Sequence, residues 1–199
     1  MIERNLTQEE VDALPFEHNL SDGHAFRSWT ESESTIIADS ARFFAESDRR
    51  GAHRAEAEYI RRYLALGAQS YVPDHFTGLM SYSASMAVEI VANLLRLRGL
   101  STALIEPCFD NIADILRRHR VPLEPFPETV LTAGAAALDA LLETITADAI
   151  FLVSPNNPTG TVVPEEAFTR IVEYCAAEGK LLVLDGCFRV YLSDEEVYD

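Results

Sequence analysis

Ser154-Pro-Asn-Asn-Pro-Thr-Gly160 lies between an apolar run, residues 149–153, and an amphipathic segment, residues 164–178. Asn, Pro and Gly all favour turns, so this stretch taken alone could be a plain turn. The run before it predicts a buried strand. The segment after it predicts a helix that begins with Pro164, as the first helical position allows. A second apolar run, residues 181–184, follows and ends in the carboxylate of Asp185.

The same alternation of apolar runs and amphipathic segments continues upstream. Further strands are expected at residues 102–105 and 121–123. Helices are expected at residues 8–14, 35–46, 53–66, 85–97, 111–120 and 133–146. Strands that alternate with helices predict an α/β fold with a mostly parallel sheet and helices on both faces. Ligands of such sheets bind beyond the carboxyl ends of the strands, where Asn157 and Asp185 are expected to lie.

Composition narrows the partners and the compartment. The 199 residues, of which 48% are hydrophobic, allow one packed domain of ordinary size. The 16 basic and 32 acidic side chains argue against nucleic acid or an anionic membrane and suit a small cationic molecule. No apolar run approaches the roughly 18 residues of a membrane helix, and we read no signal peptide. Cys108, Cys175 and Cys187 lack metal-site spacing, so we expect reduced thiols, no metal and a cytoplasmic protein.

Four pieces, taken in chain order, resemble the fold-type I enzymes that use pyridoxal phosphate (PLP), the aminotransferase superfamily. They are Ser83-Ala-Ser85 at a helix start, Pro107-Cys-Phe109 after a strand, the loop around Asn157, and Asp185. The resemblance implies PLP as the cofactor. It also implies that the chain holds the N-terminal part and the PLP-binding large domain of this fold.

The resemblance gives the first two pieces their roles at the cofactor. The backbone amides of Ser83, Ala84 and Ser85 would bind the phosphate, because the N-terminus of a helix attracts anions. Phe109 would stack on the pyridine ring. A core aromatic is the other interpretation of Phe109, and it stays open from the sequence.

Asn157 and Asp185 would hold the two polar ends of the ring. Asn157 would donate a hydrogen bond to the phenolic oxygen O3′. Asp185 would pair with the pyridine nitrogen and keep it protonated, because a nearby anion favours the charged form and a protonated ring is the better electron sink. Otherwise Asp185 would be an ordinary turn cap. Most aminotransferases have tyrosine three residues after this aspartate, where this chain has Phe188, so O3′ loses a hydroxyl donor.

A Schiff-base lysine is the remaining part that the superfamily needs, and it normally lies well beyond the aspartate. Lys180 is the single lysine of the chain, and it stands at the start of the strand that leads to Asp185, far from the expected site. We therefore expect the lysine and the small C-terminal domain to lie outside these residues. The expected organisation is a lid segment at 1–30, helices at 31–70 and a partial large domain at 71–199.

Further segments, the first of them at the N-terminus, narrow the resemblance to one group. The matching segments are Asn5-Leu-Thr-Gln-Glu-Glu10, Asp22-Gly-His24, Ala45-Glu-Ser47, Tyr82-Ser83, Phe109-Asp-Asn-Ile-Ala-Asp114 and Phe188-Arg189. They resemble the PLP-dependent L-arginine oxidases and hydroxylases of guanidino natural-product pathways, of the enduracididine type. The resemblance implies L-arginine as substrate, O2 as co-substrate, a hydroxylated or dehydro 2-oxo acid as product, and a homodimer.

Four N-terminal residues would serve the substrate in this group. By position, Thr7, Glu10 and Asp22 would recognise arginine, since carboxylates bind a guanidinium in bidentate geometry. His24 would lie near the reacting carbons and act on water as a general base. Simpler interpretations exist: Thr7 and Glu10 also form the pattern of a capping box, and residues 22–24 could be a turn with a surface histidine.

Three other functions stay open from the sequence. One is an ordinary aminotransferase, against which Phe188 argues mildly. Another is a PLP cyclodehydratase acting on hydroxyarginine, which could share the same guanidinium contacts. The third is a non-catalytic protein with a degenerate PLP fold.

Overall fold

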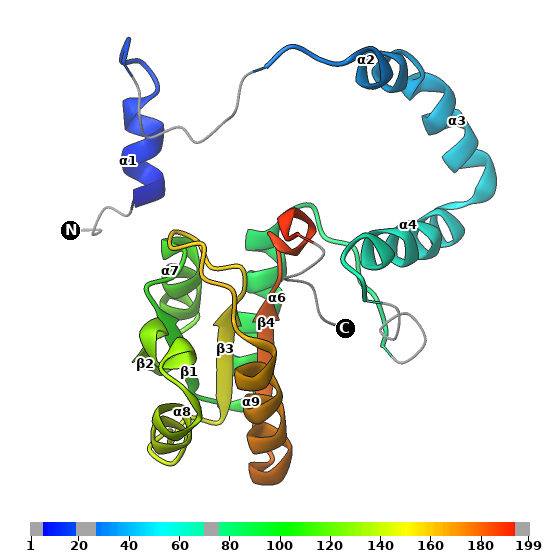
Figure 1. Cartoon of the computed structure of the whole chain (residues 1–199). Helices are drawn as coiled ribbons and strands as arrows, with labels where there is room; N and C mark the ends of the chain where they lie inside the picture. Colours follow the sequence, from blue (N-terminus) through cyan, green and yellow to red (C-terminus); the bar gives the residue numbers. More distant parts are fainter. Residues whose placement is uncertain (1–5, 19–26, 70–75, 194–199) are drawn as a thin grey trace. The chain divides into compact units, whose positions relative to one another are not determined.

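The computed structural model of the chain describes residues 6–18, 27–69 and 76–193 (Figure 1). They fall into two compact units, one ending at Met80 and one beginning at Ser81. The second unit contains the sheet, and the first contains the N-terminal helices. Among the described residues, no helix is both long and apolar enough to span a bilayer.

A parallel sheet forms the centre of the second unit. Its strands are β1 (Thr102–Glu106), β2 (Leu123–Pro127), β3 (Ala149–Val153) and β4 (Leu181–Asp185), in the spatial order β2-β1-β3-β4. Every neighbouring pair is parallel. The predicted α/β fold with a parallel sheet is confirmed.

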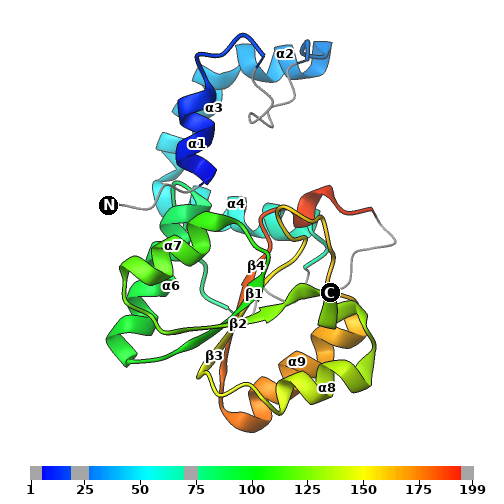
Figure 2. The same cartoon turned by 90° about the vertical axis from the view of Figure 1, so that its left-hand side faces the viewer.

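Helices cover both faces of this sheet. They are α6 (Ala84–Arg98), α7 (Asp110–Arg118), α8 (Ala135–Leu142) and α9 (Glu165–Glu178), with short 3-10 turns η1 (Glu128–Thr132) and η2 (Arg189–Tyr191). Figure 2 shows α6 and α7 on one side of the sheet and α8 and α9 on the other. All five side chains of β3 are buried, as expected for a central strand covered on both faces.

The strand order creates a switch point between β1 and β3. From β1 the chain goes to β2 on one side, and it then returns to place β3 on the other side of β1. Ligands of open α/β sheets bind in the crevice at such a reversal, outside the carboxyl ends of the strands. The loops that begin at Pro107 and Ser154 follow β1 and β3, so they flank this crevice.

The strand expected at residues 121–123 was misplaced, because β2 begins only at Leu123. Val121 belongs to the end of α7, where its amide donates to the Leu116 carbonyl (3.0 Å) after Arg120 adopts a positive φ of 60°. This is the hydrogen bond of a Schellman ending. β2 also contains Pro125 and Pro127, which an edge strand tolerates because its outer amides need no strand partner.

Two expected helices also have different bounds. The helix expected at 35–46 is two helices, α2 (Glu31–Ala38) and α3 (Ser40–Arg50), which meet at Asp39. The helix expected at 133–146 is shorter, because Gly134 precedes its first residue with a φ of 99°. The other predicted elements are present with ends that differ by one or two residues, which is the ordinary uncertainty of helix and strand limits.

The N-terminal unit contains α1 (Leu6–Ala13), α2, α3 and α4 (Ala52–Leu66). A capping box begins α2: the Thr30 side chain accepts from the Glu33 amide, and the Glu33 carboxylate accepts from the Thr30 amide at 2.7 Å. The Arg27 guanidinium binds the same carboxylate in a bidentate pair at 2.5 and 2.9 Å. These contacts, that of Arg27 first, lower the pKa of Glu33 to about 2.

Candidate functional site

The carboxyl ends of β3 and β4 bring two of the predicted site residues to one edge of the sheet. Val153 pairs with Asp185 in the ladder, and the amide of Ser154 donates to the Asp185 carbonyl at 2.9 Å. Asn157 follows three residues later and is partly exposed, as is Asp185. The loop that contains Asn157 therefore starts beside Asp185, and both side chains remain accessible to a ligand.

The loop from Asn156 to Thr161 is closed by its own backbone. The amide of Asn156 donates to the Thr161 carbonyl at 2.8 Å, and the amide of Gly160 donates to the Asn156 carbonyl at 2.7 Å. Gly160 has a φ of 76°, a conformation that residues with a side chain rarely adopt. At its start, the buried Ser154 hydroxyl accepts from the Val163 amide at 3.0 Å. The loop is thus a defined turn that holds Asn157 at its outer side.

Glu128 is the residue that the sequence analysis missed. It directly follows β2, and its side chain is buried, with 8% of the residue exposed. Its Oε2 accepts hydrogen bonds from Asn156 Nδ2 and from the Thr159 hydroxyl, the latter at 2.6 Å. Burial raises the pKa of Glu128, but the hydrogen bonds from Thr159, Asn156 and Thr161 outweigh it and lower this pKa below its ordinary value.

The side-chain amide of Asn156 spans the switch point. Its Nδ2 donates to the Pro107 carbonyl at 2.7 Å as well as to Glu128, so the loops after β1, β2 and β3 meet at one group. Both partners are acceptors, which fixes the orientation of the amide. The opposite atom, Oδ1, is buried and has no hydrogen-bond partner among the described residues. It is an acceptor that water or a bound ligand can satisfy.

Asp185 also caps the turn that follows it. Its Oδ1 accepts a hydrogen bond from the Cys187 amide at 3.0 Å. The turn-cap interpretation of Asp185 is therefore correct, and the Cys187 thiol also hydrogen-bonds this carboxylate. Phe188 comes next and is 42% exposed, with its ring centroid 6.2 Å from that of Tyr191.

Phe109 is the N-cap residue of α7, and its backbone conformation is not helical. It is partly buried and packs against the hydrophobic core, as expected if Phe109 is a core aromatic. Its neighbour Cys108 is also partly buried, and burial, then the charge of Glu106, raises the pKa of the Cys108 thiol to about 11. A stacking role for Phe109 stays a prediction.

Ser83 marks the N-terminus of α6. Its extended backbone precedes the helix, and its hydroxyl accepts from the Met86 amide at 3.2 Å. Ala84 and Ser85 are the first two helical residues, whose amides have no acceptor within a helix. Since residues 99–101 alone connect the end of α6 to β1, the helix runs back along the sheet. Its N-terminus lies toward the carboxyl ends of the strands.

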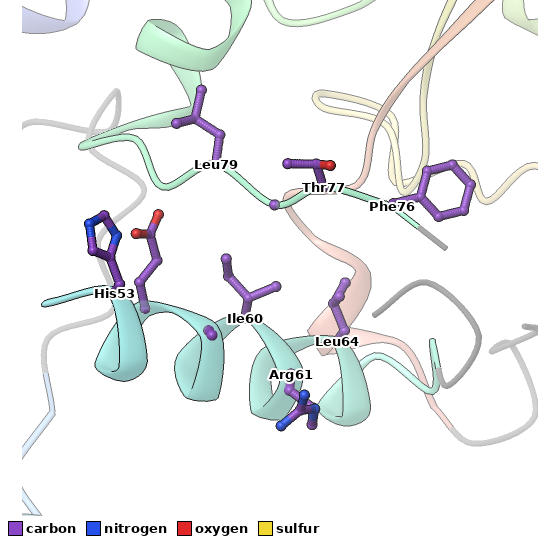
Figure 3. A pocket seen from close by; sticks show the side chains of 10 residues that line it. His53, Ile60, Arg61, Leu64, Phe76, Thr77 and Leu79 are labelled. Carbon is purple, nitrogen blue, oxygen red and sulfur yellow. The ribbon is translucent and has the colours of Figure 1, made fainter. Parts of the chain in front are cut away.

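Two hollows lie elsewhere on the two units. One, of about 640 Å³, lies at the ends of β1 and β2 beside α7 and is lined by Glu106, Asp110 and Arg117, among others. The other, of about 440 Å³, lies within the N-terminal unit between α4 and residues 76–79. In Figure 3 the side chains of Ile60 and Leu64 project into it. Neither hollow is lined by a residue predicted to bind cofactor or substrate.

The N-terminal substrate residues are only partly described. α1 begins at Leu6, one residue before Thr7, and the capping box of Thr7 and Glu10 stays a prediction. Glu10 lies within α1 and is partly buried, whereas its neighbour Glu9 is exposed. Asp22 and His24 lie outside the described residues. Within the described part of the chain, no group of three or more His, Cys, Asp or Glu side chains could hold a metal.

A family model described as aminotransferase class I and II matches residues 16–198. The chain belongs to the aminotransferase class I and II family. A solved structure described as MppP soaked with the product 2-ketoarginine is 35% identical, with a TM-score of 0.74, and the match covers 84% of this chain and 47% of that one.

Other relatives of the family are aminotransferases by name. Putative aminotransferase YugH of Bacillus subtilis is 26% identical over 173 residues, which are 85% of this chain and 44% of that protein. The chloroplastic LL-diaminopimelate aminotransferase of Arabidopsis thaliana is 42% identical over 48 residues, 24% of this chain and 10% of that protein. The chain thus spans less than half the length of the relatives that it matches.

Membership of the aminotransferase class I and II family implies PLP, and the groups at the carboxyl edge suit it. Helix N-terminal amides at Ala84 and Ser85 suit a phosphate, a carboxylate at Asp185 suits a protonated pyridine nitrogen, and the amide of Asn157 suits a phenolate oxygen. Lys180 does not belong to this set. It directly precedes β4, at the amino end of the strand and not at the carboxyl end. There its Nζ donates to the Ala147 carbonyl at 2.6 Å.

Proposed function

We propose that this chain is part of a PLP- and O2-dependent oxidase or hydroxylase of L-arginine that yields a 2-oxo acid. The observation that carries the proposal is the 35% identity, over 84% of the chain, to MppP, whose structure was soaked with the product 2-ketoarginine. 2-Ketoarginine is the 2-oxo acid of arginine. The acidic composition of the chain, 32 acidic against 16 basic side chains, supports a cationic substrate.

The chain's own residues hold the cofactor in this proposal. Ser83, Ala84 and Ser85 bind the phosphate, Phe109 stacks on the ring, Asn157 donates to O3′ and Asp185 keeps a proton on the pyridine nitrogen. When bound, PLP supplies an electron sink for the bond between Cα and its hydrogen. Asp185 strengthens this sink because its negative charge favours the protonated nitrogen.

The N-terminal residues act on the substrate. Thr7, Glu10 and Asp22 bind the arginine, the two carboxylates pairing with its guanidinium. Residues 1–30 act as a lid that excludes bulk water while the substrate is oxidised. His24 acts as the general base on the water that adds to the side chain when the product is hydroxylated.

Oxygen is the electron acceptor in this proposal. Each removal of an electron pair from arginine reduces one O2 to hydrogen peroxide, and water replaces the amino group, which leaves as ammonia. Phe188 supports this outcome, because the hydroxyl that most aminotransferases place there is missing beside O3′. We further propose that the enzyme works as a homodimer in the cytoplasm.

An aminotransferase is the second candidate. It is favoured by the family match over residues 16–198 and by relatives that carry this name. In that case a 2-oxo acid would accept the amino group, and O2 would not be reduced. The residues that hold PLP would be the same, so the two candidates differ only in the acceptor.

Oxygen-electrode traces on the PLP-loaded enzyme with L-arginine test the proposal. We expect O2 uptake that depends on arginine, with formation of hydrogen peroxide, ammonia and a 2-oxo acid. The control is the same enzyme with a neutral amino acid of similar size. An absence of O2 uptake, together with amino transfer from arginine to an added 2-oxo acid, would show that the enzyme is an aminotransferase.

A further inference from the structure

Glu128 places a buried negative charge directly beneath the loop that carries Asn157. It is 8% exposed, and a carboxylate that is removed from water is costly unless hydrogen bonds compensate it. Asn156 Nδ2 and the Thr159 hydroxyl supply those bonds, both to the same oxygen, Oε2. Hydrogen bonds to an ionised acceptor are about twice as strong as bonds between neutral groups.

These two donors stand on either side of Asn157 in the chain, and Thr161, further along the loop, also hydrogen-bonds Glu128. Asn156 precedes it, and Thr159 follows two residues later. Thr159 is also bonded to the end of the loop, because its hydroxyl accepts a hydrogen bond from the Thr161 amide at 3.2 Å. The Glu128 carboxylate therefore binds the loop both before and after Asn157, while Asn157 itself is partly exposed.

The anchor is connected to the rest of the sheet edge. Glu128 begins η1 immediately after β2, and the Asn156 amide that it binds also donates to the Pro107 carbonyl after β1 at 2.7 Å. A movement of Glu128 would thus be transmitted to the loops after β1 and β3 together. Because the hydrogen bonds outweigh burial and keep the pKa of Glu128 below its ordinary value, the carboxylate is charged at neutral pH.

We infer that Glu128 is a positioning residue, which holds the loop from Asn156 to Thr159 in the shape that aims Asn157 at O3′ of PLP. This inference rests on the proposed cofactor role of Asn157. Glu128 does not touch the cofactor in this account, and its effect on cofactor binding passes through Asn157. A purely structural role would instead stabilise the fold without a specific effect on the bound ring.

A double-mutant cycle separates these roles, with Glu128→Ala, Asn157→Ala and the double variant. The measurements are the dissociation constant of PLP and the visible absorption spectrum of the bound cofactor in the holoenzyme. We expect Glu128→Ala to weaken PLP binding about tenfold and to shift the spectrum in the same direction as Asn157→Ala. In the Asn157→Ala background, Glu128→Ala should change the dissociation constant by less than about twofold.

Matched variants control for folding. Glu128→Gln keeps the shape and one acceptor oxygen, so it should bind PLP with an affinity between those of the native protein and Glu128→Ala. It replaces Glu128→Ala in the cycle if the alanine variant does not fold. Thr169→Ala removes an exposed hydroxyl of α9 and should leave both measurements unchanged.

Two results would overturn the inference, and they are distinguishable from failure of the cofactor site. If Asn157→Ala weakens PLP binding but Glu128→Ala does not, the loop does not need its anchor. If Glu128→Ala weakens binding equally with and without the Asn157 side chain, Glu128 does not act through Asn157. If Asn157→Ala itself leaves PLP binding unchanged, the assignment of Asn157 to O3′ is wrong and the inference is lost with it.

Discussion

Phe188 differs from tyrosine by one hydroxyl, and that hydroxyl bears on the choice between the two candidate reactions. It lies three residues beyond Asp185 at the start of η2, with 42% of its surface exposed. If the ring binds as proposed, a phenol at this position would add a hydrogen bond near O3′ and so change how readily the ring accepts electrons. Restoring it tests whether the missing hydroxyl favours O2 as the acceptor.

Phe188→Tyr should raise the ratio of amino transfer to O2 uptake by about fivefold, the effect of one ordinary hydrogen bond. The measurement is the two rates on the same PLP-loaded enzyme with L-arginine and an added 2-oxo acid. Tyr191→Phe is the matched control, since it removes a hydroxyl from the neighbouring ring, which is 80% exposed. An unchanged ratio in Phe188→Tyr would mean that this position does not govern the acceptor.

At the residue level, the positions of Asn157 and Asp185 at the ends of β3 and β4 could be predicted from the sequence. The residue that anchors the Asn157 loop, Glu128, could not. Asn157 and Asp185 could be found because each follows an apolar run that reads as a buried strand. Glu128 could not, because Pro125 and Pro127 hide β2 from any strand pattern and leave Glu128 in an apparent loop. The burial of its carboxylate arises from residues that are distant in the chain, chiefly Asn156 and Thr159.

α1 presents two neighbouring acidic residues in different surroundings. Glu9 is exposed, whereas Glu10, the next residue of the helix, is partly buried. A capping box of Thr7 and Glu10 is the other interpretation of this acid. The substrate role of Glu10 is a proposal, which substitution of this residue tests.

Glu10→Gln should raise the KM for L-arginine about tenfold, because it removes one charge-assisted contact with the guanidinium. The affinity for PLP should be unchanged. Initial rates over a range of arginine concentrations provide the measurement, and Glu9→Gln on the same helix provides the control. Equal KM values for the two variants would assign Glu10 to the surface of α1 alone.

Element boundaries were predicted well where a single local pattern controls them. β3 has the predicted bounds, and α9 begins one residue after Pro164, because an apolar run and a helix-starting proline are local signals. The break between α2 and α3 at Asp39 was not predictable in this way. An apolar pattern continues through it, and Asp39 serves as the C-cap of one helix and the N-cap of the next.

On the scale of the whole chain, the sheet order explains why distant motifs share one edge. The parallel order β2-β1-β3-β4 places the residues that follow all four strands at the same side, and Asn156 and Glu128 connect three of them. The order of the strands could not be read from the sequence, since it depends on where each crossover packs. The alternation of strands and helices, which determines the fold class, could be read directly.

We propose that this edge of the sheet binds PLP with Asp185 against the pyridine nitrogen. The most direct test is the ¹⁵N NMR chemical shift of the ring nitrogen in holoenzyme loaded with ¹⁵N-labelled PLP, compared with Asp185→Asn. We expect a protonated nitrogen in the native enzyme and a neutral one in the variant, because the carboxylate favours the charged form. A nitrogen with the same protonation state in both proteins would contradict it.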